Sequence, residues 1–258
     1  MNGLFRLDGR TALITGAGGG LGREIALGFA EAGADVACAG RTLTALEMTV
    51  RQVRSLGRRA LAVRCDVSDE NQVADAVAGT IDALGPLDIL VNNAGVADVP
   101  PARVHEVATE RWHDVVEVNL HGVFYCSRQI LRGMVERQSG KIVNIASMWG
   151  LAGSATILPM PAYTAAKGAV VNLTRELALE YAGDGIQVNC LCPGFHATGI
   201  SDHVYDDEEF VAAATTLTPM RRIARACEIR GPALFLASAA SDFMTGQTLV
   251  VDGGLLAG

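Results

Sequence analysis

Short apolar runs alternate with amphipathic stretches along nearly the whole chain. The runs of strand length lie at residues 11–15, 35–39, 60–65, 88–93, 141–147, 186–192 and 248–251. Between them, helical patterns extend to about Gly33, end near Gly57, start after Ser68, and cover 109–137 and 162–183. Because the strand runs are apolar almost throughout, we expect strands that are buried on both faces.

This alternation predicts an α/β fold: a single Rossmann-type, doubly wound parallel sheet with helices on both faces. A length of 258 residues suits one large α/β domain or two small ones. Because no composition break or linker divides the chain, we expect residues 1–258 to form a single domain. Residues 196–225 interrupt the alternation with polar sequence, including the acidic stretch YDDEEF, and predict an excursion that serves as a lid.

Composition and charge narrow the range of partners. The formal net charge is −7, and no basic cluster or aromatic-basic interleaving is present, so nucleic acid is not an expected partner. No apolar run approaches the length of a membrane span, and the first ten residues lack the apolar core of a signal peptide. We therefore expect a cytoplasmic protein with no membrane partner.

The cysteines and histidines do not predict a metal site. The six cysteines include no C-x-x-C pair, and Cys190 and Cys192 share one face of a predicted strand, where small buried residues are the better interpretation. His105, His113 and His121 have no ligand-like spacing, and we interpret them as surface or structural residues.

A glycine-rich turn joins the first predicted strand to the first helix. In TGAGGGLG, residues 15–22, the glycines at 16, 20 and 22 permit a tight turn and a close approach to a pyrophosphate at the helix N-terminus. Such a turn alone is weak evidence, because tight turns use glycine anyway. Its place between the first strand and first helix favours dinucleotide binding.

Further motifs follow in a fixed order. VNNAG lies at 91–95, EVNLHG contains Asn119, and Ser147 precedes a Tyr-x-x-x-Lys pair formed by Tyr163 and Lys167. PGFHAT follows at 193–198, and VDGG at 251–254. With the G-x-x-x-G-x-G turn, these motifs resemble the short-chain dehydrogenase/reductase family from residue 11 to residue 254. Each motif is modest by itself, but six in this order are highly specific.

The resemblance implies an NAD(P)-dependent oxidoreductase that interconverts a secondary alcohol and a ketone. It implies Asn119, Ser147, Tyr163 and Lys167 as catalytic residues. It implies cofactor binding by Gly16, Gly20, Leu21, Gly22, Arg41, Asp66, Val67, Asn93, Ala94, Gly95, Tyr163, Lys167, Pro193, Gly194 and Thr198. Substrate contacts are expected from Ser147, Trp149, Tyr163 and His196. The family is commonly tetrameric, so a homotetramer is expected.

The chemistry of these residues fits hydride transfer to a carbonyl. Tyr163 is the candidate general acid in reduction and base in oxidation. A free phenol titrates near ~10, and a cation such as Lys167, on the same helix face, favours the phenolate. Ser147 can donate a hydrogen bond to the substrate oxygen. By resemblance, Asn119 holds a water that connects Lys167 to solvent.

Each residue also has a simpler interpretation. A tyrosine and a lysine four apart are usually a solvated pair, and a serine at a strand end is usually a cap. The loop between Ser147 and Tyr163 is longer than is usual in the family, so Ser154 is an alternative donor, although Ser147 lies at the strand end. Trp149 is equally pocket wall or core, and His196 either contacts substrate or is solvated.

The end of the second strand bears on cofactor choice. Asp35 opens that strand, too far from its ribose edge, whereas the strand ends in Gly40-Arg41, with no acid and a guanidinium suited to a 2′-phosphate. We therefore predict NADP. NAD stays the alternative, because the glycine turn at Gly18-Gly19 lacks the second basic residue that NADP-preferring relatives often carry. Asp66 is either an adenine-binding acid or a turn residue.

The branch of the family and the class of function leave alternatives. The resemblance is strongest to 3-oxoacyl-carrier-protein reductases and to gluconate 5-dehydrogenase-like sugar or polyol dehydrogenases. Asp184 and the acidic excursion weigh against an acidic carrier protein and towards a small free substrate. A non-catalytic nucleotide-binding regulator is the rival from another class, but such relatives usually lose the tyrosine or the lysine.

Overall fold

The computed structural model describes residues 3–198 and 207–258. Over these residues the main sheet has seven parallel strands in the order β3-β2-β1-β4-β5-β6-β9. Their bounds are β1 Thr11–Thr15, β2 Asp35–Gly40, β3 Ala60–Arg64, β4 Ile89–Asn92, β5 Gly140–Ile145, β6 Ile186–Pro193 and β9 Thr248–Val251. Every strand predicted from the apolar runs is therefore present, and the predicted parallel sheet is confirmed.

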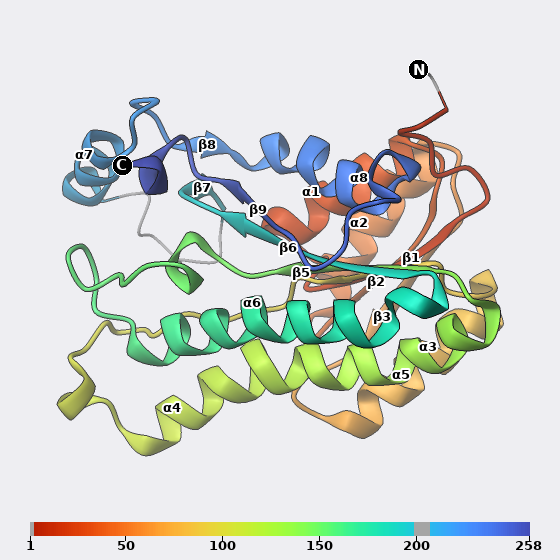
Figure 1. Cartoon of the computed structure of the whole chain (residues 1–258), viewed down its shortest axis with the longest axis horizontal. Coiled ribbons are helices and arrows are strands. Elements are labelled where there is room, and N and C mark those ends of the chain that lie inside the picture. The colour runs from red at the N-terminus through yellow and green to blue at the C-terminus, as the bar shows by residue number, and fades with distance from the viewer. Residues whose placement is uncertain (1–2, 199–206) are drawn as a thin grey trace.

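Helices cover both faces of this sheet (Figure 1). On one face lie α1 Gly20–Glu31, α2 Leu43–Ser55 and α8 Arg230–Ala237, packed over one buried apolar cluster. On the other lie α3 Glu70–Leu84, α5 Gly122–Arg137 and α6 Pro161–Tyr181, packed over a second cluster. The doubly wound α/β fold is thus confirmed. Its inner strands are buried because both sheet faces are covered, whereas the edge strands β3 and β9 are largely half-buried.

The predicted helical stretch 109–137 consists of three consecutive segments. Helix α4 (Thr109–Val116) continues into the π-helical turn η2 (Glu117–His121) and then into α5. Single π-helical turns inside α-helices are frequent at functional sites. Here the turn contains Asn119, one of the predicted catalytic residues.

Helix α3 begins after Asp69, one residue later than the predicted start after Ser68. Asp69 caps this helix: its carboxylate accepts hydrogen bonds from the backbone N–H groups of Asn71 and Gln72, at 2.9 and 3.2 Å. A carboxylate suits the helix N-terminus because it also interacts favourably with the helix dipole. The hydroxyl of Ser68 is engaged elsewhere, since it donates to Asp66 at 2.7 Å.

A buried polar network fixes the middle of the sheet against two helices. The amide of Asn92 on β4 donates to Asn144 on β5 at 2.8 Å and to Ser127 on α5 at 3.1 Å. Asn144 in turn donates to Thr174 on α6 at 3.0 Å. Because buried amides without partners are costly, this network favours one register between the strands and α6.

The chain leaves the main sheet after β6, where an excursion at 196–225 is predicted. A two-residue strand, β7 (His196–Ala197), pairs with β8 (Ala224–Arg225), and α7 (Glu208–Leu217) lies between them. Residues 199–206 of this stretch lie outside the described residues. The single domain and the lid stay predictions. None of the helices described here has the length and apolar character needed to cross a bilayer.

Candidate active site

The glycine turn after β1 forms a cradle that admits no side chain at Gly16 or Gly22. Gly16 has φ +68°, in the left-handed region, and a Cβ on Gly22 would lie 2.5 Å from the Gly16 carbonyl oxygen. Gly19, the N-cap of α1, supplies no side-chain hydrogen bond to the first turn of the helix. Backbone N–H groups at this helix terminus therefore remain available to a phosphate, and the residues present fit a dinucleotide.

The end of β4 is tied to this turn by a polar junction. The Thr15 hydroxyl accepts hydrogen bonds from the backbone N–H groups of Asn93 and Ala94, both at 3.0 Å. The Asn93 amide donates to the Thr15 carbonyl at 2.8 Å. Thr198, from the segment after β6, lies against Gly20 of the same turn. Three motifs distant in sequence thus meet at the carboxyl edge of the sheet.

Exposed cations lie at the carboxyl end of β2, where we expect the adenosine ribose of the cofactor. Arg41 directly follows this strand and is exposed, and it forms no ion pair or side-chain hydrogen bond within residues 3–198 and 207–258. Arg64, at the end of β3, is in register with Gly40 and is also exposed. Sequence reasoning missed Arg64, because the adjacency of the two strand ends follows only from the strand order.

The two acidic residues near this edge behave differently. Asp35 pairs with Arg58 at 2.9 Å and with Arg59 at 2.7 Å, at the first residue of β2 and so at the opposite edge. Asp66 accepts hydrogen bonds on Oδ1 from both the N–H and the hydroxyl of Ser68, so it closes the turn before α3. This turn uses one carboxylate oxygen of Asp66, and adenine binding stays a prediction.

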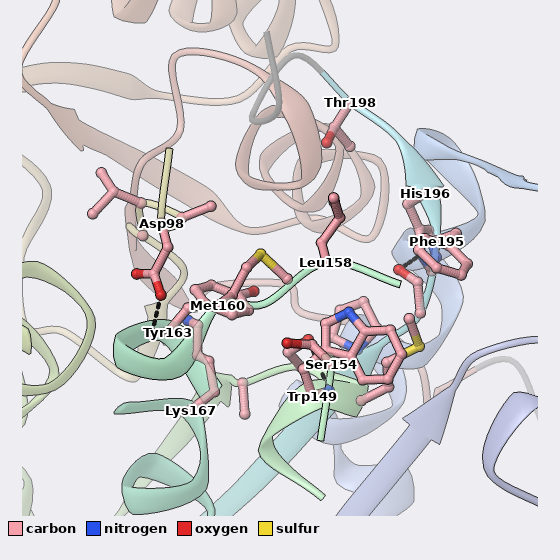
Figure 2. Close-up of a pocket in the computed structure, with 18 of the residues that line it drawn as sticks. Asp98, Trp149, Ser154, Leu158, Met160, Tyr163, Lys167, Phe195, His196 and Thr198 are labelled. Atoms are coloured by element: carbon pink, nitrogen blue, oxygen red, sulfur yellow. Dashed lines mark hydrogen bonds between the residues drawn. The ribbon is translucent and has the colours of Figure 1, made fainter. Parts of the chain in front are cut away.

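Ser147, Tyr163 and Lys167 come together at the carboxyl end of β5. Ser147 follows this strand, and its hydroxyl accepts a hydrogen bond from the Trp149 N–H at 3.1 Å and lies near enough to Tyr163 on α6 to act on the pKa of that phenol. The Lys167 Nζ atom lies 5.7 Å from the centre of the Tyr163 ring and donates to the Ile145 carbonyl at 2.8 Å. Figure 2 shows Tyr163 and Lys167 on one side of the pocket, with Phe195 and His196 opposite.

Burial determines the titration of the tyrosine and the lysine. It raises the pKa of the Tyr163 phenol, and the neighbouring Ser147 hydroxyl offsets only part of this increase. The phenol is therefore protonated at neutral pH without a cofactor, and the influence of Lys167 on its pKa stays a prediction. Burial also lowers the pKa of Lys167 to about 8.

Asn119 lies beneath this group, in the π-helical turn. Its amide donates to the carbonyls of Val96 and Val115, at 2.8 and 2.9 Å. Its Oδ1 accepts no hydrogen bond from the described residues, and it lies in the space next to Gly95 and the Lys167 ammonium. This position suits the predicted water link to Lys167, which stays a prediction.

Asp98 is a residue of this site that sequence reasoning missed. Met160, the N-cap of α6, supplies no side-chain cap. The Oδ2 atom of Asp98 supplies it instead, accepting from the N–H groups of Ala162 at 3.0 Å and Tyr163 at 3.4 Å. Burial raises the pKa of Asp98, while these hydrogen bonds and the charge of Arg111 oppose the shift. An acid three residues after VNNAG gives no sign of this contact.

The far wall of the pocket answers the remaining alternatives. Trp149 belongs both to the core and to the pocket wall. It is buried, and its ring packs edge-on against that of Phe195, with 6.2 Å between the ring centres. His196 is buried rather than solvated, with its Nδ1 atom 3.1 Å from the Gly194 carbonyl oxygen. Ser154 is buried and lines the same pocket as Ser147, so both hydroxyls have access to a substrate.

The structure brings some predicted residues into the pocket and leaves others along the sheet edge. The predicted cofactor and substrate residues that line the pocket are Leu21, Asn93, Gly95, Ser147, Trp149, Tyr163, Lys167, Pro193, Gly194, His196 and Thr198. The other predicted residues flank it: Gly16, Gly20, Gly22, Arg41, Asp66, Val67, Ala94 and Asn119. This division matches a site in which a dinucleotide extends from the pocket along the strand ends.

Comparison with known proteins decides the family. A family model described as enoyl-(acyl carrier protein) reductase matches residues 16–256. The chain belongs to the short-chain dehydrogenase/reductase family. It is 39% identical to gluconate 5-dehydrogenase of Gluconobacter oxydans, over 98% of this chain and 96% of that one. It is 42% identical to galactitol 2-dehydrogenase (L-tagatose-forming) of Cereibacter sphaeroides, over 97% and 96%.

A solved relative has the same fold. The gluconate 5-dehydrogenase of Burkholderia cenocepacia, crystallised with NADP and tartrate, superposes with a TM-score of 0.93 at 40% identity, over 100% of this chain and 99% of that one. As a member of this family, the protein is an NAD(P)-dependent oxidoreductase that interconverts a secondary alcohol and a ketone.

The buried ammonium of Lys167 makes a stability prediction. Since the pKa of Lys167 is about 8 in the fold against an ordinary 10.5, the charge destabilises the protein at pH 7 by about 3 kcal/mol. Lys167→Met removes this cost and also the bond to Ile145, worth about 1 kcal/mol. We expect the variant to be about 2 kcal/mol more stable at pH 7, and inactive.

Denaturant unfolding without cofactor measures this difference. The advantage should shrink as the pH rises from 8 to 10.5, because the wild-type lysine loses its proton in the fold first. Lys141→Met is the control, since the other lysine of the chain pairs with Asp242 at 2.8 Å. A Lys167→Met protein less stable than wild type at pH 7 would contradict the prediction.

The two serines of the pocket can be separated by single substitutions. Ser147 lies beside Tyr163 in the pocket lining, so Ser147→Ala should lower kcat by a factor of about 10²–10³, the effect of removing one donor to a developing oxyanion. Ser154→Ala should change kcat by less than about tenfold, although the pocket gains similar space. Steady-state kinetics on one ketone decide the ranking, and the reverse order would move the donor to Ser154.

Proposed function

We propose that the protein is an NADP-preferring reductase and dehydrogenase of a small free substrate, with Tyr163 as the group that transfers the proton. The observation that carries this proposal is the arrangement of Tyr163: its phenol meets Ser147 at the wall of a pocket, with the Lys167 ammonium 5.7 Å from its ring. The pocket adjoins the glycine cradle, where the residues fit a dinucleotide.

The chain's own residues have distinct parts in this reaction. When bound, the nicotinamide supplies the hydride in reduction and accepts it in oxidation. Ser147 donates a hydrogen bond to the substrate oxygen as negative charge develops there, and Tyr163 gives that oxygen its proton. Lys167 lies close enough to favour the phenolate electrostatically. Asn119 holds a water through which Lys167 exchanges protons with solvent.

The titration of Tyr163 favours reduction at neutral pH. Because burial raises the pKa of this phenol, Tyr163 carries its proton and acts as an acid without further preparation. Oxidation needs the phenolate instead, so its rate rises with pH. The same chemistry supports an active enzyme over a purely regulatory nucleotide-binding protein.

The preference for NADP rests on the cations at the sheet edge where the adenosine ribose is expected. Arg41 and Arg64 are exposed, and they extend from the adjacent ends of β2 and β3, which are in register. Asp35, the acid of β2, is at the far edge and is neutralised by arginines. A guanidinium binds a phosphate in a planar, two-pronged geometry, which suits the 2′-phosphate.

The assembly and the lid belong to the same proposal. We infer a homotetramer in which β9, the edge strand of the sheet, contributes to a subunit contact, supported by the full exposure of Phe243 just before it. Phe195 and Phe210 both line the pocket, which supports the excursion as its lid.

Tyr163→Phe tests the role of the phenol. The ring remains but the transferable proton is lost, so kcat should fall by a factor on the order of 10² or more. The Kd for NADPH should stay within about twofold of the wild-type value, since the ring that lies against the cofactor is kept and only the hydroxyl group is lost. Ketone reduction followed by NADPH absorbance, with cofactor titration by fluorescence, measures both. Turnover near that of wild type would remove Tyr163 from the mechanism.

Arg41→Ala tests the choice of cofactor. Losing a charge-assisted contact worth about 1.5–3 kcal/mol should weaken NADPH binding by roughly one to two decades and leave NADH binding unchanged. Arg51→Ala on α2 is the matched control, because its guanidinium is exposed and is 3.9 Å from Glu47. Titration of all three proteins with both cofactors is decisive: equal losses for NADH and NADPH would assign Arg41 to another contact.

A further inference from the structure

The substrate side of the pocket has largely apolar walls. The residues that form it include Trp149, Ile157, Leu158, Met160, Phe195 and Phe210. Four of these come from the lengthened loop between Ser147 and Tyr163, whereas Phe195 follows β6 and Phe210 lies on α7. Figure 2 shows Trp149, Leu158, Met160 and Phe195 around the pocket. The loop residues 148–161 contain no charged side chain at all. The body of a substrate therefore meets hydrocarbon and aromatic rings over most of its surface.

The described lining contains no cation that is free to bind an anionic substrate. Lys167 is its one lysine or arginine, and this ammonium is already bonded to the Ile145 carbonyl at 2.8 Å. Burial lowers the pKa of His196, which favours its neutral form. Arg111 is not part of the described lining, and its guanidinium donates to the Ala97 carbonyl at 2.8 Å.

The described lining contains a carboxylate instead. Asp98 lines the pocket beside Tyr163, is 3% exposed, and uses one oxygen to cap α6. The other oxygen, Oδ1, is buried without a hydrogen-bond partner among the described residues. The eight residues outside the description, GISDHVYD at 199–206, include neither arginine nor lysine in their sequence.

These features disfavour a carboxylate-bearing substrate. An anion that enters the pocket exchanges its hydration for apolar walls and finds no cation to pair with. The carboxylate of Asp98 also repels it. An uncharged ketone with an apolar body loses little on entry and gains the burial of its surface.

We propose that this site takes an uncharged ketone or secondary alcohol with a largely apolar body, and that it excludes sugar acids. The inference rests on the proposed function, because it concerns the substrate of the same reaction. It separates this chain from relatives that are named for gluconate, with which it shares 39–40% of its residues.

A matched pair of substrates tests the inference directly. A keto acid and its methyl ester share the carbonyl and the chain, and they differ in one negative charge and one added methyl group. With NADPH at pH 7.5, the ester should have a kcat/KM about 10²-fold or more above that of the acid, as expected for an unpaired buried charge. Comparable values for the two compounds, or a preference for the acid, would overturn the proposal.

Three further substrates extend the panel. A phenyl-substituted ketone should exceed a neutral ketohexose of similar size by at least about tenfold, since only the first buries apolar surface. A protonated aminoketone should not exceed its neutral analogue, because its ammonium group also exchanges its hydration for largely apolar walls. A 3-oxoacyl thioester represents the carrier-protein branch. Preference for the ketohexose or for the aminoketone would contradict the proposal.

A pair of variants checks that the pocket itself sets the selectivity. Leu158→Arg places a cation on the wall and should reduce the ester-to-acid ratio at least about tenfold, whereas Leu158→Gln, of similar length but uncharged, should leave it near the wild-type value. If circular dichroism shows both variants folded and the ester-to-acid ratio of Leu158→Arg is unchanged, then the apolar wall of this pocket does not set the selectivity, and the proposal fails.

Calorimetric binding keeps the two proposals distinguishable. The ester and the acid are titrated into the enzyme saturated with NADP, without turnover. If the ester binds and the acid does not, but no ketone is reduced, then the proposed reaction fails and the substrate class stands. If ketones are reduced but the acid binds as tightly as the ester, the reaction stands and the substrate class fails.

Discussion

The junction between the ends of β1 and β4 is the contact on which the rest of the site depends. Thr15 and Asn93 exchange hydrogen bonds there, and the Asn93 amide occupies the space beside Gly16 and Gly22 that any side chain would need. The strand order reverses at this point, with β2 and β3 on one side and β5, β6 and β9 on the other. A dinucleotide along one half thus reaches the catalytic residues of the other.

The catalytic group requires a fold that tolerates unfavourable electrostatics. Burial moves the pKa values of Tyr163 and Lys167 in opposite directions, towards the neutral forms of both. The fold accepts this because α6 is anchored elsewhere: Thr174 joins the buried amide network, and Asp98 caps the first turn. If Lys167→Met proves more stable than wild type, then the lysine is retained for the chemistry it supports and not for the fold.

The sequence predicted the strands and the polar residues that follow them, because apolar runs and strand-end motifs are local signals. It could not predict contacts that depend on strand order or on loop paths. Asp98 reaches α6 across more than sixty residues of sequence, and Arg64 acquires its place from the pairing of β2 and β3. The raised pKa of Tyr163 could not be predicted for a related reason: the proximity of a charge follows from i and i+4 spacing, but the extent of burial does not.

Asp98 links the position of the catalytic helix to the selection of substrate. Its carboxylate orients the first turn of α6, which holds Tyr163, through two backbone N–H groups. The same charge lies in the substrate pocket, where an anionic substrate would need a cation. A replacement that admits sugar acids must therefore either sacrifice the cap or add a cation on another wall. The geometry of the proton donor and the charge of the substrate are thus constrained by one side chain.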